Sequence, residues 1–80
     1  MYTIVGVQLK SFTTNDGKTV TGYNVWYTYE RDGVDGVVAE RVFVSDRVCN
    51  NSSFTPHVRD VVRGFAYTRF GSLYQVDLPD

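Results

Sequence analysis

The chain has 80 residues, which is enough for one domain over residues 1–80 and for one hydrophobic core. Eight Lys and Arg against nine Asp and Glu give a net charge of −1, which argues against a nucleic-acid binder that works by charge alone. β-Branched and aromatic residues are abundant and good helix formers are scarce. This composition excludes a helical bundle and predicts an all-β domain. No apolar run is long enough to cross a membrane and no signal peptide is recognisable, so we expect a cytoplasmic product without a membrane partner.

The first half of the chain predicts three strands. Apolar and polar residues alternate over residues 2–12, which is typical of a strand with one buried face. Asn15, Asp16 and Gly17 then predict a turn, because these residue types tolerate positive φ. A β-branched and aromatic run over residues 19–30 predicts a second strand, antiparallel to the first. Two Asp-Gly pairs in residues 32–36 predict an exposed turn, and residues 37–44 predict the third strand.

The second half predicts a short helical turn and two further strands. Ser45 and Asp46 favour a capped turn through residues 47–50, and residues 50–53 favour a loop. Residues 58–68 predict a fourth strand interrupted by Gly64, and residues 73–78 predict a fifth after a tight turn. Five antiparallel strands with at most one short helical turn predict a small OB-like β-barrel, with an SH3-like barrel as the alternative. A helical turn between strands three and four favours the OB-like arrangement.

Residue types used in catalysis are scarce. His57 stands beside Pro56 in a predicted loop, where we expect it to be solvated. Cys49 is the only cysteine, and we expect it to be a small buried side chain. No Asp or Glu cluster has the spacing of metal ligands, and no glycine-rich loop opens a helix. We therefore expect no catalytic residues, no metal site, no cofactor and no small-molecule substrate, which leaves a binding module and not an enzyme.

Aromatic residues are the most informative feature of the second strand. Tyr23, Tyr27 and Tyr29 share one side of it, whereas Trp26 lies on the other side. A small domain has a single core in which to bury such rings. The tyrosines therefore either rim the core or a dimer interface, or they form a platform on which unpaired bases stack.

Basic residues recur beside aromatic ones, as in Arg41 and Phe43 on one side of strand three, and in Arg69 next to Phe70. An arginine beside a ring can hold a phosphate while the ring stacks on a base. The acidic residues of the turn at 30–35 are expected to gather negative charge at one end and to leave a basic groove elsewhere. The candidate nucleic-acid contacts are Lys18, Tyr23, Tyr27, Arg41, Phe43, Arg63, Arg69 and Phe70.

Two segments carry a resemblance to a known family. They are Phe12-Thr13-Thr14, followed by Gly17 and Gly22, and Phe70-Gly71-Ser72-Leu73. With them the chain resembles the small single-stranded-DNA-binding, helix-destabilising proteins of filamentous phages, the gene V protein type. The resemblance implies an OB-like fold, a homodimer and cooperative coating of single strands during phage DNA replication. It also implies that Phe70 stacks on bases and that the tip at residues 15–18 contacts the DNA backbone.

The chain departs from the family where the family carries arginines. Its first hairpin has Asn15, Lys18 and Val20, and Asp77 stands in the last strand. The sequence thus predicts a sequence-tolerant binder of single-stranded DNA or RNA from a phage or mobile element, which leans on stacking more than on charge. An SH3-like module that binds proline-rich peptides is the alternative. A structural subunit whose aromatic residues are all used in self-association is a third possibility.

Overall fold

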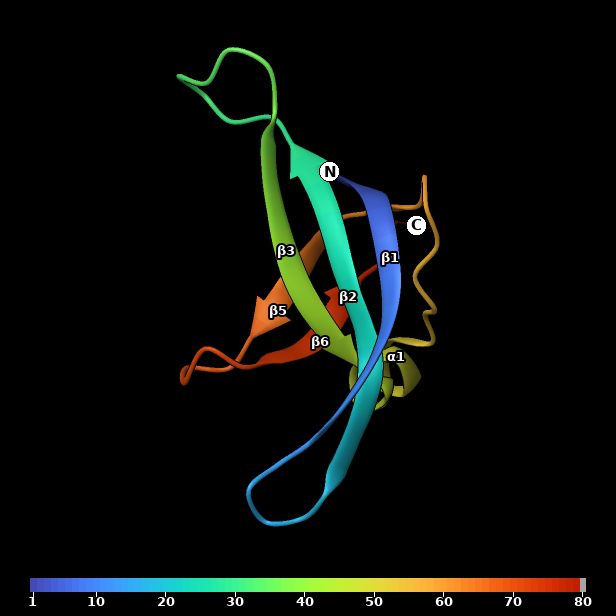
Figure 1. Cartoon of the computed structure of the whole chain (residues 1–80). Coiled ribbons are helices and arrows are strands. Elements are labelled where there is room, and N and C mark those ends of the chain that lie inside the picture. The colour runs from blue at the N-terminus through green and yellow to red at the C-terminus, as the bar shows by residue number, and fades with distance from the viewer. Residues whose placement is uncertain (80) are drawn as a thin grey trace.

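A computed structural model describes residues 1–79, so the last residue of the expected domain lies outside the described part (Figure 1). The protein is mostly β with one short helix, which confirms the predicted fold class. Within residues 1–79, no helix has the length and apolar character needed to span a bilayer. In chain order, the elements are β1 (Tyr2–Thr13), β2 (Thr19–Tyr29), β3 (Val38–Ser45), α1 (Asp46–Ser52), β4 (Val61–Val62), β5 (Gly64–Tyr67) and β6 (Leu73–Asp77).

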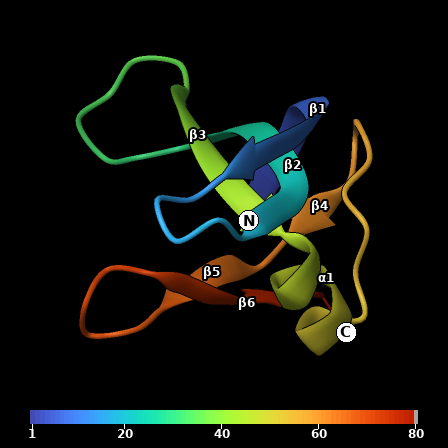
Figure 2. The ribbon, with the colours of Figure 1, turned by 60° about the horizontal axis from the view of Figure 1, so that its bottom comes forward.

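The strands form two antiparallel layers. One sheet has the order β3-β2-β1-β4, and β5 pairs with β6 in a second, two-stranded sheet. The long strands β1, β2 and β3 curl into a half-barrel, and the β5–β6 hairpin lies across its open side (Figures 1 and 2). The fourth strand predicted for residues 58–68 is wrong at residues 58–60 and 68, and the remainder is divided: β4 pairs with β1, whereas β5 pairs with β6. The chain therefore changes sheets at Arg63, and its fourth and fifth strands complete opposite layers.

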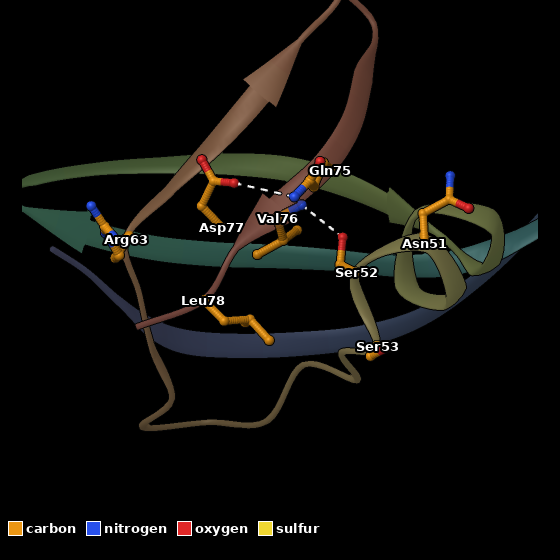
Figure 3. Close-up of a pocket in the computed structure, with 8 residues that line it drawn as sticks. All are labelled: Asn51, Ser52, Ser53, Arg63, Gln75, Val76, Asp77 and Leu78. Atoms are coloured by element: carbon orange, nitrogen blue, oxygen red, sulfur yellow. Dashed lines mark hydrogen bonds between the residues drawn. The ribbon is translucent and has the colours of Figure 1, made fainter. Parts of the chain in front are cut away.

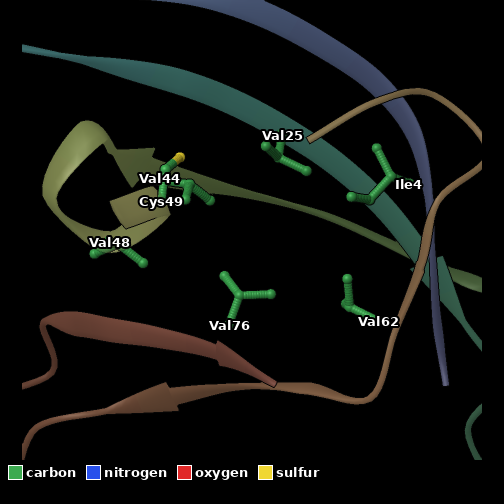
Figure 4. Close-up of a cluster of buried hydrophobic side chains, with 7 residues drawn as sticks. All are labelled: Ile4, Val25, Val44, Val48, Cys49, Val62 and Val76. Carbon is green, nitrogen blue, oxygen red and sulfur yellow. The ribbon is translucent and has the colours of Figure 1, made fainter. Parts of the chain in front are cut away.

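The core lies between the two layers and is narrow. In the core cluster, each of the strands β1, β2, β3, β4 and β6 contributes one fully buried residue and α1 contributes two buried residues (Figure 4). These buried side chains are Ile4, Val25, Val44, Val48, Cys49, Val62 and Val76. Burial of a valine contributes about 1.5–3 kcal/mol. A core made of so few small side chains leaves most of the twelve aromatic rings at its rim or on the surface.

Helix α1 closes one end of the half-barrel. Its N-cap is Ser45, whose hydroxyl accepts a hydrogen bond from the Val48 N–H at 3.3 Å, as the sequence predicted. The helix continues to Ser52, so the loop predicted for residues 50–53 is wrong for its first three residues. Ser52 accepts a 2.8 Å hydrogen bond from the Val76 N–H, which fastens the last turn to β6. The position of α1 between β3 and β4 is the one expected for the OB-like arrangement.

Gly22 of β2 lies tightly against the backbone at the end of β3. The register of β2 against β1 is regular at this residue, so it is not a bulge. A Cβ at Gly22 would lie 2.6 Å from the Cα of Ser45 and would also overlap the carbonyl oxygen of Val44. These are backbone atoms, which cannot move aside as a side chain can. The tight curl that joins β3 to α1 therefore requires a residue without a side chain.

We expect Gly22→Ala to destabilise the fold by about 1–3 kcal/mol, because the added methyl group meets backbone atoms. Urea unfolding followed by circular dichroism measures this difference. Gly64→Ala is the matched control, since a Cβ there lies 3.9 Å from the Tyr2 ring, an ordinary contact. Equal midpoints for the two variants would contradict the role assigned to Gly22.

Candidate nucleic-acid interface

The turn between β5 and β6 presents one aromatic ring to solvent. Thr68 organises this turn: its hydroxyl accepts hydrogen bonds from the N–H groups of Phe70 and Ser72, both at 3.3 Å. Gly71 adopts a φ of 84°, which closes the turn. Phe70 at the tip is 82% exposed. The Arg69 guanidinium lies 5.1 Å from the centre of the Phe70 ring, so a stacking surface and a cation are held side by side.

The first hairpin tip carries one lysine and one aspartate. The Thr14 N–H donates to the Lys18 carbonyl at 2.8 Å, which places Lys18 at the exposed end of the hairpin. Asp16 stands on the same tip, and its carboxylate accepts a hydrogen bond from the Thr14 hydroxyl. This hydrogen bond lowers the pKa of the Asp16 carboxyl below its ordinary value. An ionised carboxylate therefore accompanies the Lys18 ammonium, and the tip carries little net charge.

The strand register assembles a second surface on the side of the sheet that faces away from the core. Arg41 lies opposite Trp26, which in turn lies opposite Gly6, and Phe43 lies opposite Asn24. We name this surface the outer sheet face and define it by Lys10, Phe12, Trp26, Arg41 and Phe43. Arg41 and Phe43 share this face, in agreement with their spacing in the sequence.

Glycines allow the rings of the outer sheet face to lie close to the backbone. A Cβ on Gly6 would be 3.3 Å from the Trp26 ring, so the indole covers this glycine. The Phe43 ring lies over Gly22 in the same way and meets Phe12 edge to face at 5.4 Å between centroids. Trp26 and Phe12 remain 38% and 45% exposed. The result is a shallow aromatic surface flanked by the cations of Lys10 and Arg41.

Tyr23 and Tyr27 do not belong to this surface. They lie on the opposite, inward side of β2, where Tyr23 packs against the core and Tyr27 is only 5% exposed. Of these two predicted contacts, Tyr27 is buried and Tyr23 is partly buried, and the structure does not bring them to the outer sheet face. The exposed aromatic residues of that face are Trp26 and Phe12. The signal for them was the alternation along β2: once Tyr27 is inside, its neighbour Trp26 has to be outside.

Arg63 lies apart from the other predicted contacts. It lines an open groove of about 600 Å³ beside α1 and the end of β6, together with Ser52, Gln75 and Asp77 (Figure 3). Its backbone N–H donates to the Asp77 carbonyl at 2.8 Å. The Asp77 carboxylate lines the same groove. This part of the surface is therefore mixed in charge and is not continuous with the aromatic rings of the sheet.

Charge is separated along the length of the molecule. The acidic turn at residues 30–35 and the first hairpin tip lie at opposite ends of β2 (Figure 1), in a molecule about 44 Å long.

Cys49 and His57 are the remaining residues of types that are often used in catalysis. Cys49 is buried in α1, and burial raises the pKa of its thiol. The His57 side chain is 73% exposed and its Nδ1 lies 3.7 Å from the Asp60 carboxylate. Across residues 1–79, no three His, Cys, Asp or Glu side chains come together as a metal site would require.

Comparison of the chain with protein-family models, with curated proteins and with solved structures gives no match. Support for a nucleic-acid interface therefore comes from the geometry of its side chains.

The inward face of β2 carries a group of tyrosines around Glu40. The Tyr29 hydroxyl donates to the Glu40 carboxylate at 2.6 Å, and the Tyr27 hydroxyl donates at 3.3 Å. Burial first, and then the negative charge of Glu40, raise the pKa of Tyr27 far above its ordinary value of about 10. The hydrogen bond to Glu40 also raises the pKa of Tyr29, and burial raises that of Tyr67.

We expect the fold to lose stability at alkaline pH because of Tyr27. Unfolded Tyr27 releases its proton near pH 10, whereas folded Tyr27 holds it to a higher pH. The free energy of unfolding is therefore unaffected by this group below about pH 9 and falls above pH 10, by up to about 1.4 kcal/mol per pH unit. Urea unfolding at a series of pH values measures the slope.

Tyr27→Phe should make that alkaline slope shallower, while it loses the hydrogen bond to Glu40 at every pH. Tyr74→Phe, at an exposed tyrosine of β6, is the control and should leave the slope as it is. A Tyr27→Phe slope equal to that of the parent protein would contradict this account.

Proposed function

We propose that this protein binds single-stranded nucleic acid with little sequence preference, as a single-stranded-DNA-binding protein does. The observation that carries the proposal is the Phe70 ring, 82% exposed at the tip of a hydrogen-bonded turn with the Arg69 guanidinium against it. Burying a phenylalanine stabilises a fold by about 1.5–3 kcal/mol. The exposed Phe70 ring does not gain this stabilisation in the folded protein. Its exposure leaves the ring accessible to a base, as stacking requires.

The outer sheet face supports the same proposal from a second direction. Trp26, Phe43 and Phe12 offer ring surface on which successive bases can stack, and Arg41 and Lys10 flank them. Every base has a ring face, so stacking of this kind tolerates any sequence. The net charge of −1 agrees with a binder that uses few phosphate contacts.

Titration with oligo-dT at low salt tests the proposal. Trp26 is the only tryptophan and lies on the outer sheet face, so a base stacked there should quench its fluorescence. With Lys10, Arg41 and Arg69 as phosphate contacts, the logarithm of the affinity should fall with the logarithm of salt concentration at a slope of about −2. Gel filtration of the same samples gives the oligomeric state, and a homodimer is part of the proposal.

Three outcomes decide between the candidate functions. Absence of binding to a labelled oligonucleotide at tens of micromolar would overturn the proposal. Binding of a proline-rich peptide with an affinity that salt barely changes would favour the peptide-binding module instead. A large assembly without a DNA response would favour a structural subunit.

Phe70→Ala should weaken oligo-dT binding by about 1–3 kcal/mol without lowering the unfolding midpoint, because the ring stacks on a base and is not part of the core. Val58→Ala, at an exposed side chain between α1 and β4, is the control and should bind as the parent protein does. Unchanged affinity of the Phe70 variant would remove this residue from the interface.

A further inference from the structure

A second hollow lies on the inward side of the half-barrel, near the acidic end of β2. It has a volume of about 220 Å³, several times the 30 Å³ or so that one water molecule takes up in the liquid. Five of its six lining residues are aromatic and the sixth is a glutamate. We name it the tyrosine pocket, and its residues are Tyr2, Tyr27, Tyr29, Glu40, Phe65 and Tyr67.

The aromatic rings that line the tyrosine pocket pack against one another without a ligand. Tyr2 lies edge-on to Tyr27 and to Phe65, with centroid distances of 5.5 and 5.4 Å. Tyr27 lies 4.7 Å from Phe65, which joins β2 of the large sheet to β5 of the small one. Rings that brace each other across two sheets lose little freedom when a ligand enters.

The charge at the pocket is negative. Both Tyr27 and Tyr29 donate hydrogen bonds to the Glu40 carboxylate. Within residues 1–79, no Lys or Arg forms an ion pair with Glu40. One cation stands beside a ring of the pocket: the Arg31 guanidinium lies 5.9 Å from the Tyr29 ring centre. Burial is the main cause of the raised pKa values of Tyr27 and Tyr67, and the negative charge of Glu40 raises both further.

We propose that the tyrosine pocket binds an organic cation, a methylated ammonium group, between its aromatic rings and Glu40. Aromatic rings attract such a cation, while the Glu40 carboxylate supplies the opposite charge. A metal ion does not fit, because a hard cation takes several oxygen ligands and the pocket has one carboxylate. A phosphate does not fit either, because Glu40 repels it.

The experiment is an NMR titration of the ¹⁵N-labelled protein with tetramethylammonium chloride. Saturable shifts of the amide signals of Glu40, Phe65 and Tyr67 are expected, with a dissociation constant on the order of 1 mM. Neopentyl alcohol is a neutral molecule of similar shape and should bind at least about fivefold more weakly. Equal affinity for the two probes would overturn the proposal. So would the absence of saturation at concentrations up to about 100 mM.

Two variants test the role of the lining residues. Glu40→Gln keeps an oxygen that can accept from Tyr29 but removes the charge, so tetramethylammonium should bind at least about fivefold more weakly. Tyr67→Ala removes one wall and should cost about threefold in affinity. Tyr74→Ala is the matched control for it, since Tyr67 and Tyr74 are each 48% exposed and only Tyr67 lines the pocket. Unchanged affinity in both the Glu40 and the Tyr67 variants would overturn the proposal.

The same titration distinguishes the two sources of such a head group. Choline carries it on a free small molecule, and an acetylated trimethyl-lysine amide carries it on a protein side chain. Tighter binding of choline assigns the pocket to a small molecule, whereas tighter binding of the lysine derivative assigns it to a methylated protein. Oligo-dT binding should be unaffected by Glu40→Gln, so failure at this pocket is separate from failure of the nucleic-acid interface.

Discussion

The register of β2 is the constraint on which the rest of the structure depends. This strand is paired on both sides, with β1 and with β3, and its odd-numbered residues from Tyr23 to Tyr29 face inward. A slip of one residue would exchange the two faces of the strand. Burial of Val25 between two valine-rich neighbours prevents that slip. With this register set, Trp26 is outside and Tyr27 is inside, and both proposed sites follow.

The two sites use alternate residues of the same strands. On β3, Glu40 belongs to the tyrosine pocket and its neighbour Arg41 belongs to the outer sheet face. Opposite charges next to each other in the sequence thus act on opposite sides of one sheet. Because the sheet separates them, an anionic strand outside and a cation inside need not compete for the same surface.

Several of the acidic residues that balance the charge of the chain lie at three places in the structure. Acidic residues occupy the turn between β2 and β3, stand beside Lys18 in the first hairpin, and share a groove with Arg63. Arg41 lies opposite Trp26, and Arg69 lies against the Phe70 ring. In the function proposed above, charge guides single-stranded nucleic acid to these two arginines, and stacking supplies most of the affinity.

Elements that depend on interactions between residues close in the sequence could be predicted from the sequence. The Ser45 cap and the turn at residues 69–72 depend on neighbours within a few residues, and these predictions agree with the structure. The end of α1 was missed because Asn and Ser favour loops by themselves. A hydrogen bond from β6 to Ser52 holds those residues helical, and it joins residues 24 positions apart.

The sequence by itself determined an all-β domain, its main turns and the pairing of cations with aromatic rings. Only the tertiary structure decided which face of β2 is buried, since aromatic residues on both faces leave its alternation ambiguous. It also decided that the fourth predicted strand divides at Arg63, because β4 finds its partner in β1 and β5 finds its partner in β6. The tyrosine pocket belongs to this second group. Its rings come from β1, β2 and β5, and no local pattern brings Tyr2, Glu40 and Phe65 together until the two sheets pack.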